Sequence, residues 1–155
     1  MYPRKQERTI INALRPNWVV VLYGARRTGK TVLMNKILQQ NRQKKILHLT
    51  GDDLEMAEVL KTQKLSVLKR LVKGYDYLFI DEAQIVPNIG ASLKLMVDQI
   101  PGLHLFITGS SALDMKNTTG EPLTGRGAFL QLYPLALSEM QEDYMAMRQR
   151  LEERL

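Results

Sequence analysis

The sequence predicts an α/β domain built on a mainly parallel sheet. Short apolar runs alternate along the chain with stretches of helical periodicity, which is typical of strands joined by crossover helices. The apolar run at 77–80 is uninterrupted, as expected for a strand buried on both faces of a parallel sheet. A glycine-rich loop at 24–31 follows the first apolar run and precedes the first long helical pattern.

The elements are expected in the following order. A short helix lies within residues 2–16 and ends at Arg15 and Pro16, because a residue before proline is disfavoured in a helix. Strands are expected at about 17–23, 45–50, 77–80, 103–108 and 128–133. Helices are expected at about 30–41, 54–62, 65–73 and 88–100, with a loop at 112–127. A charged helix at 138–155 opens on the capping-box pair Ser138 and Gln141.

Length and composition indicate one globular domain over residues 1–155. The chain is 45% hydrophobic and 25% charged, which is ordinary for a soluble protein. The absence of cysteine excludes a disulfide framework and cysteine metal sites, and it fits a reducing compartment. The sequence shows neither a signal-peptide pattern nor an apolar run near 18 residues, so we expect a cytoplasmic protein without a membrane segment.

The net charge of +6 has several explanations. A site for an anionic nucleotide accounts for part of it, and the rest fits a nucleic-acid partner, an acidic protein partner or a solvated surface. Aromatic residues are not interleaved with the basic ones, and no dense basic stripe is present. Nucleic-acid binding is therefore the weaker alternative.

The loop at 24–31 reads GARRTGKT, a full match to the phosphate-binding pattern GxxxxGK[ST]. Glycines let the backbone approach a polyphosphate, and the following helix adds the positive end of its dipole. Lys30 is expected to reach the β- and γ-phosphates of ATP, and Thr31 to offer its hydroxyl to Mg²⁺. The predicted nucleotide-binding residues are Gly24, Ala25, Arg26, Arg27, Thr28, Gly29, Lys30, Thr31 and Val32. Arg26 and Arg27 can face solvent, a partner or the phosphates, and we favour solvent or a partner because the pattern requires no charge at these positions.

A second half of the site follows the apolar run at 77–80. Asp81 comes 50 positions after Thr31 and ends a predicted parallel strand, where open α/β sheets bind ligands. Asp81 is expected to bind Mg²⁺, and Glu82 to orient and deprotonate the water that attacks the γ-phosphate. A helix cap is the alternative for an isolated Asp-Glu pair, and the phosphate-binding loop at this spacing argues against it.

Two further positions are candidates for catalysis. Thr108 and Ser110 lie at the end of the next predicted strand, where a hydroxyl can contact the γ-phosphate or the attacking water, and periodicity does not choose between them. Arg126 precedes the last predicted strand, from which an arginine can reach the nucleotide of a neighbouring subunit. A simple turn and a solvated loop arginine are the respective alternatives.

The motifs GARRTGKT, FIDEAQ, FITGSSA and LTGRGAFLQLYPLALSE, in this order, resemble bacterial and archaeal AAA+-type ATPases. The resemblance covers about residues 2–142 and is to the branch whose ATPase core usually precedes a C-terminal domain of unknown function. It implies a P-loop NTPase fold, a three-layer sandwich with a five-stranded parallel sheet in the order 5-1-4-3-2. In P-loop domains the segment before the first strand often lies near the adenine, so Arg4 and Ile10 are candidate neighbours of the base. The alternatives are a surface position for Arg4 and a core position for Ile10.

The resemblance further implies roles for the site residues. It assigns ATP and Mg²⁺ binding to Gly29, Lys30, Thr31 and Asp81. It assigns catalysis to Glu82, a sensor to Thr108 or Ser110, and an arginine finger to Arg126, which would make the partner a second subunit. Relatives continue after the fifth strand into a lid and a C-terminal domain, so this chain is expected to be truncated there.

Three classes of function fit these motifs. The first is an ATP hydrolase that couples turnover to an attached domain or a protein partner. The second is a nucleotide-dependent switch or scaffold that hydrolyses little ATP. The third is a fragment of a superfamily 1 helicase, favoured only by the Asp-Glu-Ala-Gln sequence, because 155 residues cannot hold two helicase domains. A small-molecule kinase shares the phosphate-binding loop but usually lacks the glutamate at position 82.

Overall fold

The computed structural model describes residues 4, 6–110 and 123–135, together with residues 140, 145, 148, 149 and 152. Most of the helix expected at 138–155, including Ser138 and Gln141, lies outside the described residues. The same holds for residues 112–122 of the expected loop.

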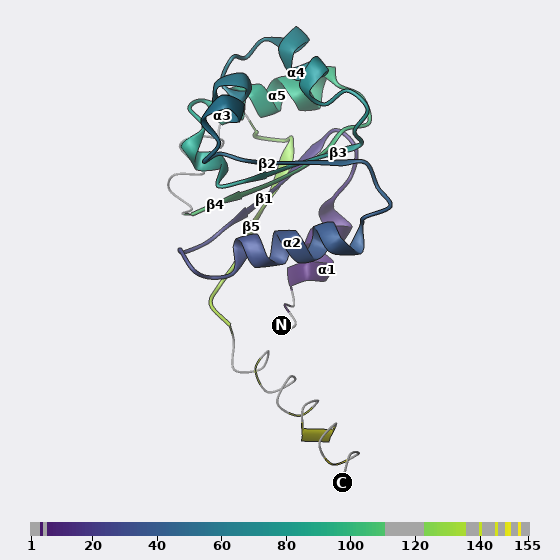
Figure 1. Ribbon diagram of the computed structural model, residues 1–155, viewed down its shortest axis with the longest axis vertical. Helices are drawn as coiled ribbons and strands as arrows, with labels where there is room; N and C mark the ends of the chain where they lie inside the picture. The colour runs from purple at the N-terminus through teal and green to yellow at the C-terminus, as the bar shows by residue number, and fades with distance from the viewer. Residues whose placement is uncertain are drawn as a thin grey trace.

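A five-stranded parallel sheet forms the centre of the molecule (Figure 1). Its strands lie in the order β2-β3-β4-β1-β5, and all four neighbouring pairs are parallel. The strands are β1 (Trp18–Tyr23), β2 (Ile46–Thr50), β3 (Tyr77–Asp81), β4 (His104–Gly109) and β5 (Gly127–Gln131). This order is the expected 5-1-4-3-2 seen from the opposite edge, so the predicted architecture is confirmed.

Helices cover both faces of the sheet, which makes three layers (Figure 1). One face carries α1 (Gln6–Ala13) and α2 (Lys30–Gln40), and the other carries α3 (Leu54–Leu60), α4 (Leu65–Leu71) and α5 (Ile89–Gln99). The observed ends lie within a few residues of the expected ones. A short 3₁₀ helix, η1 (Ala83–Ile85), follows β3 and was not among the expected elements.

The two faces of the sheet have separate hydrophobic cores, and β1 contributes to both. Val19 and Val21 belong to the core that includes residues of α3, α4 and α5, whereas Val20 and Leu22 belong to the core that includes residues of α1 and α2. All four side chains are fully buried. This central position explains why the sequence of β1 is continuously apolar rather than alternating. In the described part of the chain, no helix is both long and apolar enough to cross a membrane.

Candidate functional site

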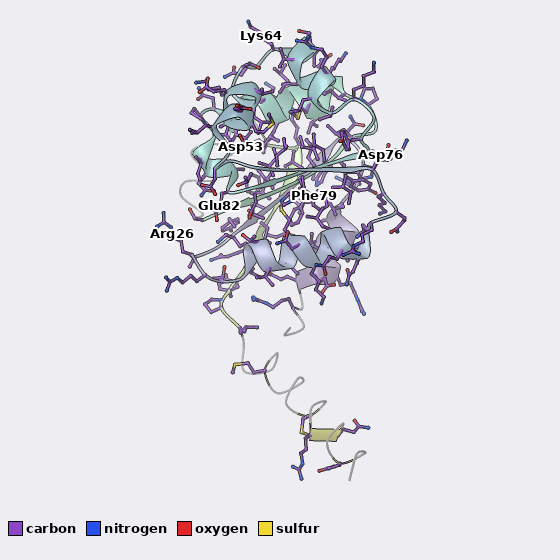
Figure 2. All side chains as sticks on the ribbon, in the orientation of Figure 1. Arg26, Asp53, Lys64, Asp76, Phe79 and Glu82 are labelled. Atoms are coloured by element: carbon purple, nitrogen blue, oxygen red, sulfur yellow. The ribbon has the colours of Figure 1, made fainter. Side chains whose placement is uncertain are left out.

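The predicted site residues gather at the carboxyl edge of the sheet. Parallel strands all end at the same edge, so the segments that follow β1, β3 and β4 meet there. Figure 2 shows Arg26 and Glu82 at this edge and Asp76, which precedes β3, at the opposite one. The topology thus brings together residues that are 50 or more positions apart in the sequence.

The loop at 24–31 has the backbone of an anion-binding turn. Arg27 has a φ of 65° and Gly29 a φ of 92°, so two residues of the loop are left-handed. Left-handed residues alternating with right-handed ones turn successive N–H groups toward one side and form a concave anion site. The loop leads directly into α2, whose first N–H groups have no partner within the helix. The positive end of this helix therefore faces the concave side.

Gly24 is required by a close contact between two segments of backbone. Its N–H donates to the carbonyl of Gly109 at 3.3 Å, which joins the loop to the end of β4. A Cβ atom at this position would lie 2.3 Å from the carbonyl oxygen of Leu132, just after β5. Real Cβ atoms do not approach backbone that closely, so any other residue would push the loop away from β5.

Lys30 lies beneath the loop. Its side chain is buried, and Nζ donates to the carbonyl oxygens of Gly24 and Ala25, each at 2.9 Å. Burial lowers the pKa of Lys30 below its usual value, and the negative charges of Glu82 and Asp81 partly oppose this shift. The ammonium group is thus near both carboxylates and has no carboxylate bound to it directly among the described residues.

The carboxylate of Asp81 is held between two hydroxyl groups. Thr31, in the first turn of α2, donates to Oδ2 at 2.7 Å, and Thr108 of β4 donates to Oδ1. Adjacent oxygens around an octahedral Mg²⁺ ion lie about 3 Å apart when each metal–oxygen distance is about 2.1 Å. The spacing of the Thr31 and Asp81 oxygens therefore fits two neighbouring ligands of Mg²⁺.

Glu82 has a left-handed backbone, with φ 50° and ψ 42°. Its N–H donates to Oγ1 of Thr108 at 3.1 Å, so the same hydroxyl group contacts both acidic residues. Gly51, just after β2, donates to the carbonyl of Asp81 at 2.8 Å, and a Cβ there would lie 2.4 Å from the carbonyl oxygen of Glu82. The turn that carries Glu82 is fixed from both neighbouring strands. Sequence reasoning missed Gly51, although a glycine directly after a strand signals close backbone approach.

The structure distinguishes the two candidate sensor positions by their contacts. Thr108 is fully buried and contacts Asp81 and Glu82, as described above. Ser110 is half-buried and follows the end of β4. It makes no side-chain hydrogen bond with any residue that the structure describes.

Arg126 lies at the amino edge of the sheet, away from the other predicted site residues. Its carbonyl accepts from the N–H of Val19 near the start of β1, whereas the phosphate-binding loop follows the end of that strand. Its Nε donates to Oδ1 of Asp98 on α5 at 2.8 Å, and Nη1 donates to the carbonyl of Thr124 at 3.3 Å. The hydrogen bond from Arg126 lowers the pKa of the Asp98 carboxyl. Arg126 therefore does not reach the site of its own chain.

A cavity of about 370 Å³ opens beside the phosphate-binding loop. Its surface is mostly apolar and comes from the loop, α2, the segment after β5 and Arg4, which precedes α1. The lining residues are Arg4, Arg27, Thr28, Gly29, Val32, Leu33, Lys36, Pro134 and Leu135. Arg4 donates from Nη1 to the carbonyl of Thr28 at 2.9 Å and from Nη2 to that of Tyr133. Ile10, the other candidate neighbour of the base, is fully buried in the core and does not line this cavity.

Comparison with known proteins identifies relatives of the chain. The sequence profile described as "AAA domain" matches residues 16–141. Two uncharacterized proteins of Methanocaldococcus jannaschii are similar: MJ1544 is 29% identical over 128 residues, and MJ1637 is 26% identical over 130 residues. These matches cover 81% and 78% of this chain. The chain spans only 29% and 27% of the length of these relatives.

Two solved structures have a similar fold. Domain III of the replication initiation protein DnaA from Thermotoga maritima superposes with a TM-score of 0.55 at 18% identity, covering 78% of this chain and 57% of that one. AMPPCP-bound DnaA from Aquifex aeolicus superposes with a TM-score of 0.52 at 16% identity, covering 95% of this chain and 48% of that one. The profile matches most of the chain and the fold agrees with it, so the chain belongs to the family of bacterial and archaeal AAA+-type P-loop ATPases.

Proposed function

We propose that this domain binds Mg²⁺–ATP at the carboxyl edge of its sheet and hydrolyses it. The observation that carries the proposal is the contact of Thr31 with Asp81, because it joins the phosphate-binding loop to the acidic end of β3. A hydroxyl and a carboxylate at this spacing suit Mg²⁺ beside a nucleotide, as argued above. When bound, Mg²⁺ would neutralise charge on the β- and γ-phosphate oxygens.

The phosphates bind in the concave side of the loop at 24–31. Backbone N–H groups and the start of α2 surround them, and Lys30 exchanges its two carbonyl contacts for the β- and γ-phosphates. Such an exchange favours binding, because a charged ammonium bonds more strongly to a phosphate oxygen than to a neutral carbonyl. The exposed side chain of Arg26 remains available to solvent or to a partner, whereas Arg27 lines the cavity beside the loop.

The nucleobase occupies the apolar cavity beside the loop. Arg27 and Gly29 of the loop and Val32 of α2 line this cavity, so a base and its phosphates can bind together. Its volume of about 370 Å³ lies within the range of small-molecule sites. The AMPPCP bound to Aquifex aeolicus DnaA, a protein of similar fold, agrees with an adenine nucleotide as the ligand.

Hydrolysis uses Glu82 as the general base. Its carboxylate takes a proton from water as the water oxygen bonds to the γ-phosphorus, and the bond from that phosphorus to the β–γ bridging oxygen breaks. The products are ADP and inorganic phosphate. Thr108 supports this step from β4 by contacting both Asp81 and the N–H of Glu82. Turnover would drive an attached domain or a protein partner, since the matched region makes up less than a third of each of these relatives.

A nucleotide-dependent switch is the second candidate. The observation that favours it is the position of Arg126, which is too far from its own site to stabilise the transition state without a neighbouring subunit. A single chain would then bind ATP and hydrolyse it slowly.

Two variants test the proposal. Lys30→Ala should abolish the nucleotide-induced rise in melting temperature, a stabilisation that reaches about 2.7 kcal/mol when the ligand is at 100 times its Kd. Lys69→Ala, an exposed lysine on α4, serves as the control and should leave this rise unchanged. Glu82→Gln should retain the rise but slow single-turnover hydrolysis by about 100-fold or more. Equal, near-zero rates in the wild type and Glu82→Gln would instead favour the switch.

A further inference from the structure

The side chain of Gln84 contacts the carboxylate of Glu82. Gln84 is the middle residue of η1, and its Nε2 donates to Oε2 of Glu82 at 2.5 Å. The reverse orientation of the amide would turn its carbonyl oxygen toward the carboxylate, and two acceptors would then repel each other. In the part of the chain that the structure describes, this is the one side-chain hydrogen bond to the Glu82 carboxylate that is recorded.

The other half of the same amide is left unsatisfied. Oε1 of Gln84 is buried, and no hydrogen-bond donor reaches it from the described residues. A buried acceptor without a partner is unfavourable, because it loses its hydration and no hydrogen bond replaces it. The contact of Nε2 with Glu82 therefore sets the orientation of this amide, since Oε1 gains no hydrogen bond from it.

The backbone below this contact is also held in an unfavourable conformation. The left-handed conformation of Glu82 is unfavourable for a residue with a Cβ atom. Gly51 and Thr108 hold this backbone from β2 and β4, but neither contacts the carboxylate. Among the described residues, the amide of Gln84 supplies the hydrogen bond that restrains the side chain of Glu82.

We propose that Gln84 is a positioning residue that holds the Glu82 carboxylate where it can take a proton from the attacking water. The inference rests on the proposed role of Glu82 as general base. A general base must lie within hydrogen-bond reach of its proton, and small misplacements are costly. A neutral amide orients the carboxylate through one oxygen, leaves the other free to accept, and does not neutralise the charge as a lysine or arginine would.

The test compares variants in single-turnover ATP hydrolysis with protein in excess and in nucleotide affinity. Gln84→Met keeps the length of the side chain and removes the donor, and Gln84→Glu places a like charge against Glu82. Both should slow hydrolysis by about 10- to 100-fold, with Kd for ATP within about twofold of the wild type. Gln99→Ala, at the exposed end of α5, should change neither quantity. A nucleotide-induced rise in melting temperature verifies that each variant is folded.

A double-mutant cycle separates positioning from a merely structural role. If Gln84 acts through Glu82, then Gln84→Met should cause no further loss in a Glu82→Gln background. An equal loss in both backgrounds, or a loss of affinity that matches the loss of rate, would overturn the inference. The inference would also be overturned if Gln84→Met and Gln84→Glu hydrolysed ATP at the wild-type rate while Glu82→Gln was slow. That pattern would leave the proposed function intact. A wild-type rate in Glu82→Gln would overturn both proposals.

Discussion

Thr31 and Asp81 are 50 positions apart in the sequence, and the hydroxyl of one donates to the carboxylate of the other at 2.7 Å. This hydrogen bond joins the start of α2 to the end of β3, so it directly connects the phosphate-binding loop with the acidic residues that follow it in the site. It also means that a hydroxyl at position 31 has two functions. It orients Asp81 in the protein alone, and in the proposed complex it would be a ligand of Mg²⁺ beside that carboxylate.

Replacing Thr31 by Val should raise the Mg²⁺ concentration needed for ATP binding. Valine has the shape of threonine but offers no oxygen, whereas Thr31→Ser retains the hydroxyl and should behave like the wild type. The measurement is nucleotide affinity by calorimetry across a Mg²⁺ titration, and we expect Thr31→Val to lose about tenfold or more in apparent Mg²⁺ affinity. Superimposable Mg²⁺ titrations for Val and Ser would contradict the assignment of Thr31 as a ligand.

Nucleotide affinity should fall at alkaline pH, and the fall should begin at a lower pH than it would for a lysine with an ordinary pKa. Burial lowers the pKa of Lys30, and only the charged ammonium pairs with phosphate. Above that lowered pKa, affinity should drop about tenfold for each pH unit. Nucleotide phosphates, with a last pKa of about 6, are already ionised there. Lys30→Arg retains its charge throughout, so parallel pH profiles for the two proteins would contradict this explanation.

The lowered pKa of Lys30 also affects folding stability, and it does so in the opposite direction to nucleotide affinity. Between the lowered pKa of Lys30 and its usual value of 10.5, the unfolded chain binds a proton that the folded chain does not. The free energy of unfolding contributed by this group therefore rises with pH across that interval. Nucleotide binding and folding stability should thus change in opposite directions there.

The sequence predicted the parts of the site that depend on local pattern and on parallel topology. The loop at 24–31 and the acid after β3 are recognisable from residue types alone, and a parallel sheet brings them to one edge. The strand order came from the family resemblance, because periodicity identifies a strand but not its neighbours. Thr108 and Ser110 could not be separated, since residues two apart point to the same face of a strand.

What could not be predicted depends on the approach of distant backbone segments. The left-handed conformation of Glu82 is compatible with its sequence only because Gly51 and Thr108 hold it from adjacent strands. The pairing of Asp98 with Arg126 joins α5 to the turn before β5, which no local pattern connects. Such contacts arise from packing, so they are visible only in three dimensions.

Thr108→Val should impair both stability and hydrolysis. Valine has the same shape but leaves the N–H of Glu82 without its acceptor and Asp81 without one donor, which costs about 1–3 kcal/mol in a buried site. Thr108→Ser retains the hydroxyl and should restore most of the activity. Melting temperature and single-turnover rate are the two measurements. A large loss of rate in Ser110→Ala, with little loss in Thr108→Val, would assign the sensor to Ser110 instead.

Gly51→Ala should slow hydrolysis without a change at the phosphate-binding loop. The added Cβ would lie 2.4 Å from the carbonyl oxygen of Glu82 and 3.3 Å from Cβ of Ile85, so the turn must shift. Overpacking of this kind typically costs about 1–3 kcal/mol. Gly74→Ala is the matched control, because its φ of +85° disfavours alanine while no atom lies within 4 Å. Chemical denaturation should find both variants destabilised, and only Gly51→Ala should lose hydrolysis. Equal rates in the two variants would contradict the link between Gly51 and Glu82.

Arg126 should act only between chains. It lies at the amino edge of the sheet, so a contribution to catalysis requires the site of a neighbouring subunit. The rate of ATP hydrolysis per molecule should therefore rise with protein concentration in the wild type and stay low in Arg126→Ala. Arg70→Ala, an exposed arginine on α4, should retain the wild-type dependence.

Mixing two inactive variants tests the same idea directly. Arg126→Ala has an intact nucleotide site but no arginine to offer, and Lys30→Ala has the arginine but no working site. In a mixed assembly the second chain supplies Arg126 to the site of the first, so activity should exceed the sum of the separate proteins. The pair of Arg126 with Asp98 restrains the arginine through Nε and leaves Nη2 without a hydrogen bond to the described residues. Activity that is flat on dilution, together with a mixture no more active than its components, would show that Arg126 serves only its ion pair with Asp98.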